Sequence, residues 1–228
     1  YVRRALAPLD AALLGCYLNP AHPDEASYRD ALRRYEAHLR FAGWLGGCIV
    51  ATETGNFNVE NRFDPAISPT DDALARWMDR AYPIVQAAEA LGVVFAIEPT
   101  ANHVVNTPQR TRRVLDEIAS PNLRVVLDPV NLLSAENVGR RDEVIAEALD
   151  LLGEDTVLLH VKDYRMVNGA IVSMGVGLGD MDYGPVADYV AKHKPHLHMT
   201  LEDTTPDNAA ACRLHFEGLL RKAGAEIE

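Results

Sequence analysis

The chain has 228 residues, of which 48% are hydrophobic and 24% charged, and it carries a formal net charge of -11. This length and composition are typical of one globular domain with a sizeable core, and they exclude a largely disordered chain. The acidic balance argues against a protein that holds nucleic acid through its phosphates, because such binding needs clustered Lys and Arg side chains.

Six short apolar runs predict the strands of a sheet. They span residues 11–18, 48–52, 93–98, 123–128, 156–161 and 197–202. Most of them are nearly continuous in apolar residues, as is typical of parallel strands buried on both faces. Because helical patterns alternate with these runs, the sequence predicts βα units within a single domain over residues 1–228.

Helical periodicity fills the intervals between the strands. Gly43 and Gly92 are the predicted ends of the first two long helices, and Pro83 is expected to kink or break the second. The last helix is predicted over residues 207–223. Predicted helix starts lie at Ser27, Thr70, Thr107, Asp142 and Asp182.

The spacing of the later strand ends indicates a barrel. Glu98, Asp128, His160 and Glu202 end successive strands at intervals of 30, 32 and 42 residues, close to the roughly 30-residue βα unit of an eight-fold barrel. Six units are visible, and the chain opens at Tyr1 within an amphipathic pattern. We therefore expect an α/β fold, a (β/α)8 TIM barrel that lacks its first strand, first helix and second strand.

Those four strand ends also predict a metal site. The carboxyl ends of barrel strands converge on one face, where active sites of such barrels lie. A single acid or histidine there is commonly a helix cap or a solvated charge, but four in register favour a ligand set. Glu98, Asp128, His160 and Glu202 offer oxygens and one imidazole nitrogen, which suit Mn²⁺, Mg²⁺, Co²⁺ or Zn²⁺.

Five strings of the sequence carry a family resemblance. They are F-A-I-E-P-T, V-V-L-D-P-V-N-L-L, L-L-H-V-K-D, G-V-G-L-G-D-M-D-Y and T-L-E-D. In order and spacing they resemble the sugar phosphate isomerase/epimerase superfamily, the xylose isomerase-like TIM barrels. The resemblance implies that Glu98, Asp128, His160 and Glu202 bind one divalent ion, with Mn²⁺ expected first. It also implies that Glu98 and Glu202 move protons.

Two positions depart from the ketose 3-epimerases of that superfamily. Those members carry a histidine three residues after the metal-binding aspartate, where this sequence has Asn131. They also carry an arginine beyond the strand histidine, and Arg165 lies near that place. Asn131 and Arg165 are therefore predicted to contact substrate, while the sequence leaves the ketose 3-epimerase assignment open.

Further residues are candidates for substrate contact. Strand alternation places Lys162 on the same side as His160, where we expect it either to stabilise an enolate or to form a salt bridge. His103 and Glu53 are predicted to contact substrate, although a surface role is an equal alternative for His103. The glycine run at 175–179 is expected to form a substrate-side loop, and residues 54–69 form either a lid or an insertion.

The leading interpretation is a divalent-metal-dependent sugar isomerase or epimerase, or a related dehydratase, that acts on a small polyhydroxy carbonyl compound. The alternatives are a metal hydrolase resembling abasic-site endonucleases and an inactive partial barrel. Cys16, Cys48 and Cys212 show no disulfide or zinc spacing, which favours the cytoplasm. The expected partner is a sugar-like small molecule, without nucleic acid or membrane, and a homo-oligomer is compatible with the sequence.

Overall fold

The computed structural model describes residues 2–7 and 9–227 of the chain. These residues form two compact units that divide between Val126 and Leu127. All six predicted strands are present, and helices alternate with them along the chain. The predicted α/β alternation is therefore confirmed.

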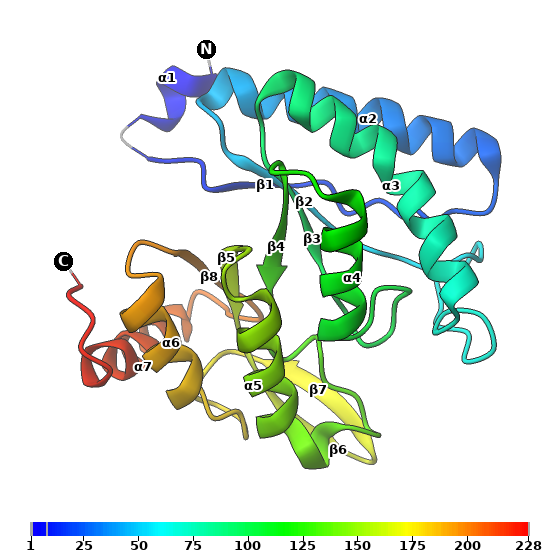
Figure 1. Ribbon diagram of the computed structural model, residues 1–228. Coiled ribbons are helices and arrows are strands. Elements are labelled where there is room, and N and C mark those ends of the chain that lie inside the picture. Colours follow the sequence, from blue (N-terminus) through cyan, green and yellow to red (C-terminus); the bar gives the residue numbers. More distant parts are fainter. Residues whose placement is uncertain (1, 8, 228) are drawn as a thin grey trace. The chain divides into compact units, whose positions relative to one another are not determined.

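The first unit is built on parallel strands that pair in the order β1, β2, β3 and β4. Glu53 of β2 lies opposite Glu98 of β3 in this register. Each strand is followed by a helix or a loop at its carboxyl end, as Figure 1 shows. The strands span Leu13–Gly15 (β1), Ile49–Glu53 (β2), Phe95–Glu98 (β3) and Leu123–Leu127 (β4), the last of which reaches the boundary between the units.

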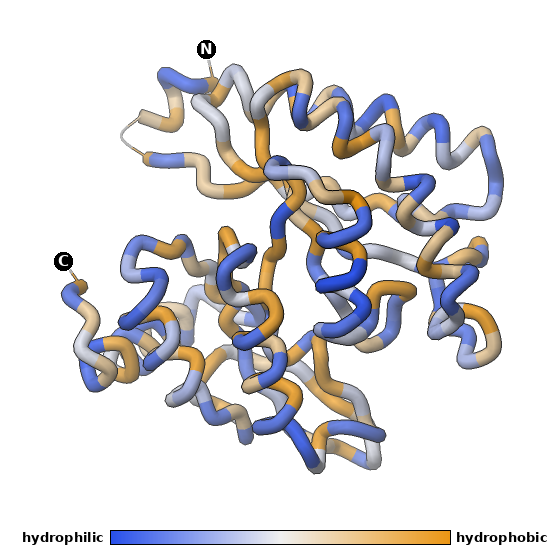
Figure 2. Tube along the Cα trace, viewed as in Figure 1, coloured by the Kyte–Doolittle hydropathy of each residue, from blue (hydrophilic) through white to orange (hydrophobic). Residues whose placement is uncertain are grey.

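Helices α2 and α3 pack side by side on this sheet (Figure 1). Hydrophobic residues line the sides of these helices that face the strands (Figure 2). On α2 the buried Tyr35 donates or accepts a hydrogen bond with Thr52 at 2.8 Å and meets Phe95 edge-on. The helices span Val2–Leu6 (α1), Glu25–Leu45 (α2), Asp71–Leu91 (α3) and Pro108–Ile118 (α4).

The predicted ends of α2 are wrong. Asp24 caps the helix, and its carboxylate accepts a hydrogen bond from the Ser27 amide at 2.8 Å. The helix continues past Gly43 and ends at Gly46, which adopts the left-handed conformation with φ 117°. Glycine is favoured at that φ, so Gly46 and not Gly43 terminates the helix.

Of the two predicted effects of Pro83, a kink or a break in α3, the break does not occur. The helix runs through it from the Thr70 cap to Gly92, both of which were predicted. Buried residues lie on either side of the proline, including Trp77 and Ile84. Their packing compensates for the roughly 3 kcal/mol that an internal proline costs a helix.

The second unit contains two pairs of neighbouring strands. Strands β5 (Thr156–Val161) and β8 (His198–Leu201) are parallel neighbours. Strands β6 (Asp163–Val167) and β7 (Ala170–Met174) form an antiparallel hairpin that the sequence analysis did not predict. The helices are α5 (Arg141–Leu152), preceded by the 3-10 turn η1 (Val138–Arg140), α6 (Gly184–His193) and α7 (Ala209–Lys222).

The starts of α4, α5 and α6 lie close to their predicted positions. Asp142 falls in the first turn of α5, which begins one residue earlier. Asp182 precedes α6 and accepts a hydrogen bond from the Gly184 amide at 2.8 Å. Thr107 caps α4 with Pro108 in the first turn, as predicted.

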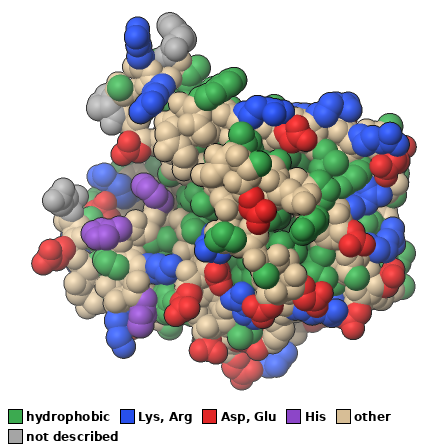
Figure 3. All heavy atoms as spheres, turned by 45° about the horizontal axis from the view of Figure 1, so that its top comes forward, with side chains coloured by type: hydrophobic (Ala, Val, Ile, Leu, Met, Phe, Trp, Pro, Cys, Tyr) green, Lys and Arg blue, Asp and Glu red, His purple; other side chains and the backbone are tan. Residues whose placement is uncertain are grey.

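Acidic and basic side chains intermix on the face shown in Figure 3. On α2 they form pairs one helical turn apart, such as Arg40 with Glu36 at 2.9 Å. Cys16, Cys48 and Cys212 are all buried free thiols. Among the described residues, none of the helices has the length and apolar character needed to cross a membrane.

The hairpin is held against the glycine run at residues 175–179 by Asp163. Its buried carboxylate accepts hydrogen bonds from the amides of Gly177 at 3.0 Å and Met181 at 2.8 Å. Gly179 packs so closely that an added Cβ would clash with the Tyr164 carbonyl and the Asp163 carboxylate. This close packing explains why a glycine occupies position 179.

We therefore expect Gly179→Ala to lower the free energy of unfolding by about 1–3 kcal/mol, because the new methyl group must displace backbone. Urea unfolding followed by circular dichroism measures the change. Gly218→Ala is the matched control, since Gly218 lies in α7 with nothing within 4 Å of its would-be Cβ. This control should raise stability by up to about 1 kcal/mol. Equal effects of the two variants would contradict the packing argument.

Candidate active site

The pairing of β5 with β8 brings the strand-end residues of the second unit together. His160 lies opposite Thr200, and the Glu202 amide donates a hydrogen bond to the Val161 carbonyl at 3.0 Å. Side chains two residues apart on a strand point to the same face. His160 and Lys162 therefore share a face with Glu202.

A lysine ammonium lies at the centre of this group. Lys162 Nζ is 2.8 Å from Asp128 Oδ2 and 2.9 Å from Glu202 Oε2. His160 Nδ1 lies 3.1 Å from Glu202 Oε1 and 4.0 Å from Asp128 Oδ2. These four residues are called the strand-end cluster below. Two carboxylates, one imidazole and one ammonium thus converge, with nitrogen–oxygen distances of 2.8 to 4.0 Å.

Backbone amides fix the orientation of Asp128. Its Oδ1 accepts hydrogen bonds from the amides of Val130 at 2.9 Å and Asn131 at 3.1 Å. The Asp128 carboxylate is fully buried. Because one oxygen is held by the following loop, the other faces Lys162 and His160. Asn131, a predicted substrate contact, thus takes part in the site through its backbone.

Tyr183 holds the backbone of Lys162. Its hydroxyl donates to the Lys162 carbonyl at 2.7 Å and accepts from the Lys162 amide at 3.1 Å. Burial, aided by the charge of Asp128, raises the pKa of this hydroxyl well above its ordinary value, so it remains a neutral donor. The sequence analysis missed Tyr183, since no local pattern links it to a residue 21 positions earlier.

The two carboxylates keep Lys162 protonated. Burial by itself lowers the pKa of this amine, but the charges and hydrogen bonds of Asp128 and Glu202 outweigh burial and raise the pKa above its usual value. Lys162 therefore acts as a fixed positive charge and hydrogen-bond donor. It is not available as a neutral base.

Glu202 is the most accessible member of the cluster. Its side chain is 32% exposed, whereas those of His160 and Lys162 are at most 7% exposed. The next residue, Asp203, has a φ of 51°, a value that aspartate tolerates better than most residues. The backbone thus turns sharply just after Glu202.

In the first unit, the strand ends carry Glu53 and Glu98. Glu98 is 2% exposed, and the Tyr17 hydroxyl donates to its Oε2 at 3.4 Å. His103 lies five residues beyond Glu98 in the loop after β3 and is buried. Burial lowers the pKa of His103 to about 4, against the opposing effect of the negative charge of Glu98. The imidazole is therefore neutral at physiological pH.

Asn56 joins the loops that follow β1, β2 and β3. Its amide nitrogen donates to the Asn102 carbonyl at 2.9 Å, and its carbonyl oxygen accepts from the Ser68 hydroxyl at 2.7 Å. Its backbone carbonyl accepts from Asn19 at 2.8 Å. Asn56 is fully buried, so these bonds are shielded from water. Sequence reasoning did not single out this residue.

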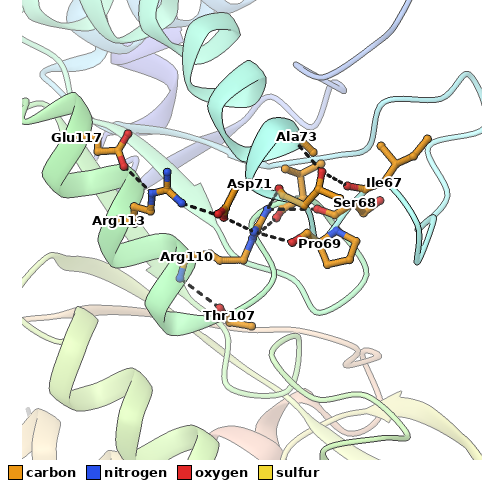
Figure 4. Close-up of polar contacts among 11 residues, drawn as sticks. Ile67, Ser68, Pro69, Asp71, Ala73, Thr107, Arg110, Arg113 and Glu117 are labelled. Atoms are coloured by element: carbon orange, nitrogen blue, oxygen red, sulfur yellow. Dashed lines mark hydrogen bonds and ion pairs between the residues drawn. The ribbon is translucent and has the colours of Figure 1, made fainter.

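Arg110 fixes the end of the segment 54–69, as Figure 4 shows. Its guanidinium donates to the carbonyls of Pro69 at 2.9 Å, Thr70 at 3.0 Å and Ser68 at 3.3 Å. Its Nε donates to the Val104 carbonyl at 3.0 Å. The segment that the sequence left open as a lid or an insertion is thus tied down at its carboxyl end.

Within the second unit, the structure brings four of the predicted site residues together. Asp128, His160, Lys162 and Glu202 form one cluster in the second unit. Arg165 lies on β6, opposite Val172, with an exposed side chain. Glu53, Glu98 and His103 belong to the first unit.

Similar solved structures share this fold. A D-tagatose 3-epimerase-like protein is 16% identical, with a TM-score of 0.79, over 98% of this chain and 82% of that chain. A 3-keto-D-glucoside 4-epimerase from E. coli is 18% identical, with a TM-score of 0.74, over 97% and 83% of the two chains. A xylose isomerase-like TIM barrel protein from Mycobacterium smegmatis, in complex with magnesium, is 14% identical, with a TM-score of 0.68, over 97% and 76%.

No curated protein sequence matches the chain. At these identities the structural matches establish the TIM-barrel-like α/β fold alone. The family described as xylose isomerase-like TIM barrel matches residues 3–221. Nearly the whole chain is covered by that match, and the resemblance inferred from the sequence is confirmed. The chain belongs to the xylose isomerase-like TIM barrel family.

Proposed function

We propose that this chain is a divalent-metal-dependent isomerase or epimerase of a small polyhydroxy carbonyl compound. The single observation that carries the proposal is the strand-end cluster, in which Asp128 and Glu202 share one cation, Lys162 Nζ, and His160 lies beside both carboxylates. The likeness to proteins described as a sugar epimerase and as epimerase-like supports the same class of reaction.

The donor set of the cluster fits a divalent ion. Asp128 and Glu202 supply hard carboxylate oxygens, and His160 supplies a nitrogen, a combination that suits Mn²⁺ and is compatible with Mg²⁺, Co²⁺ or Zn²⁺. The carboxylates already converge on one positive charge. Glu98 is proposed as a further ligand solely from its position at the end of β3.

A divalent ion bound there would polarise the carbonyl of the substrate and increase the acidity of the adjoining C–H group. Glu202, the most accessible carboxylate, is proposed to take that proton. Its oxygens are oriented by His160 and Lys162 at 3.1 Å and 2.9 Å. A base held in this way loses little entropy when it reacts.

Lys162 is proposed to stabilise the negative charge that develops on the substrate oxygen. An ammonium held by two carboxylates and by Tyr183 needs no reorganisation when that charge appears. Donation of a proton to the same carbon from the opposite face, for which Glu98 is the proposed donor, gives an epimer. Return of the abstracted proton to the neighbouring carbon gives an aldose-ketose pair. Loss of hydroxide instead gives dehydration.

Metal content is the first test. We expect purified protein to hold about one divalent ion per chain after dialysis against Mn²⁺, as measured by inductively coupled plasma mass spectrometry. Asp128→Ala combined with His160→Ala should abolish this binding. The matched control is Asp188→Ala combined with His196→Ala, two exposed residues of the same unit, which should bind as the wild type does. Equal metal content in all three proteins would overturn the site.

Solvent exchange tests proton abstraction. In D₂O with Mn²⁺, we expect deuterium to enter the carbon beside the carbonyl of a free ketose, an inosose or a hydroxypyruvate-like compound, detected by proton NMR. Glu202→Gln should slow this exchange by about 100-fold or more, because an amide cannot accept the proton. Glu98→Gln tests the role proposed for Glu98 in the same assay. Exchange that continues at the wild-type rate in Glu202→Gln would exclude Glu202 as the base.

Lys162→Met separates the catalytic from the structural role of the lysine. In metal-free protein this change leaves the buried Asp128 without its counter-charge, so we expect the free energy of unfolding to fall by about 3 kcal/mol. Saturating Mn²⁺ should restore most of that stability, while exchange stays about 100-fold slower than in the wild type. Thermal unfolding with and without Mn²⁺ measures the first effect. Full exchange activity in the metal-bound variant would show that Lys162 has no catalytic role.

A further inference from the structure

The loop after β3, Thr100–Asn106, contains a concentration of unsatisfied polar atoms. Among the described residues, Thr100 Oγ1, His103 Nδ1 and Asn106 Oδ1 are buried and have no hydrogen-bond partner. His103 is only 8% exposed. Buried polar atoms are nearly always paired, so three unpaired ones within seven residues indicate partners that the protein itself does not supply.

Several backbone amides of the same loop are hydrogen-bonded, and this makes rearrangement of the loop costly. The Thr100 amide donates to the Val105 carbonyl at 3.2 Å, and the His103 amide donates to the Thr100 carbonyl at 2.9 Å. The Val104 amide donates to the Gly55 carbonyl at 3.0 Å. The loop therefore presents its unpaired side-chain atoms on a fixed frame, as a pre-organised binding site does.

Two arginine side chains beside this loop already interact with other groups of the protein. Arg110 donates to four backbone carbonyls, one of which belongs to Val104 in the loop (Figure 4). Arg113 pairs with Asp71 and Glu117. Binding a phosphate through either guanidinium would require these interactions to break. The adjoining helix α4 thus offers structural, not ligand-binding, arginines.

The three side chains of the loop that have unpaired atoms are uncharged. A threonine hydroxyl, an imidazole and an amide oxygen are groups that pair with hydroxyls, each of which donates one hydrogen bond and accepts others. The low pKa of His103 keeps its imidazole uncharged. An ionised phosphate or carboxylate would gain no counter-charge from these three side chains.

We propose that the Thr100–Asn106 loop binds hydroxyl groups of an uncharged, unphosphorylated polyhydroxy substrate, with His103 Nδ1 as its principal contact. The proposal rests on the proposed function and narrows its substrate class. His103 is a binding residue and takes no part in metal binding.

Binding is tested directly by NMR, independently of turnover. In the uniformly ¹⁵N-labelled chain with Mg²⁺, a diamagnetic ion, we expect the NMR signals of the His103 ring nitrogens to shift on titration with D-fructose or D-tagatose. The corresponding 6-phosphates should produce the shift only at concentrations more than about 10-fold higher, since the loop supplies no charge for the phosphate. Tighter binding of the phosphates, or no His103 shift with any of these compounds, would overturn the proposal.

His103→Leu and His103→Gln provide the kinetic test. With whichever ketose shows deuterium exchange, His103→Leu should raise KM at least about 10-fold with kcat changed less than about 3-fold, and His103→Gln should recover part of the loss. Metal content should be unchanged in both. His196→Gln, at an exposed position of the second unit, is the control and should leave KM unchanged.

The outcomes separate this inference from the proposed function. Bound metal and ketose exchange with an unchanged KM in His103→Leu would mean that ordered water alone occupies the loop. Absence of metal and of exchange with every compound would refute the proposed function, while the NMR titration would still decide whether the loop binds a polyol.

Discussion

The ammonium of Lys162 between Asp128 and Glu202 is the interaction on which the second unit depends. Its two contacts, at 2.8 and 2.9 Å, join the segment after β4 to the segment after β8. A buried pair of this kind adds little net stability by itself, but it imposes one geometry, because loss of either partner leaves a charge unpaired. The position of Glu202 relative to His160 follows from that constraint.

The same ammonium sets the charge that any ligand meets. Two carboxylates and one ammonium give these three members of the cluster one net negative charge. A divalent cation would turn that into one net positive charge, which favours an oxyanion on the substrate. The lysine thus offsets the negative charge of one carboxylate and leaves that of the other.

The first unit uses hydrogen bonds between loops for a similar purpose. The polar atoms of Asn56 and Arg110 form hydrogen bonds with backbone and side-chain groups of neighbouring loops. These bonds tie the loops after β1, β2 and β3 to one another and to the start of α3. Side chains that project from such loops need little further ordering when a ligand binds.

The strands and the strand-end cluster were predictable because both follow from short-range patterns. Apolar runs mark buried parallel strands, and residues at their carboxyl ends meet when the strands pair. The β6–β7 hairpin was missed although Asn168-Gly169, with φ values of 51° and 80°, is a strong hairpin signal. Tyr183, Asn56 and Arg110 could not be predicted, since their partners lie far away in sequence and are mostly backbone atoms.

The β6–β7 hairpin begins directly after Lys162 and ends at Met174, which lies directly opposite Asp163. Because Asp163 also anchors the glycine run, the base of the hairpin is closed independently of its tip. Insertions or deletions around Asn168 can therefore change the reach of the hairpin while Lys162 and His160 keep their places. The hairpin can therefore vary in length without altering the charges of the cluster.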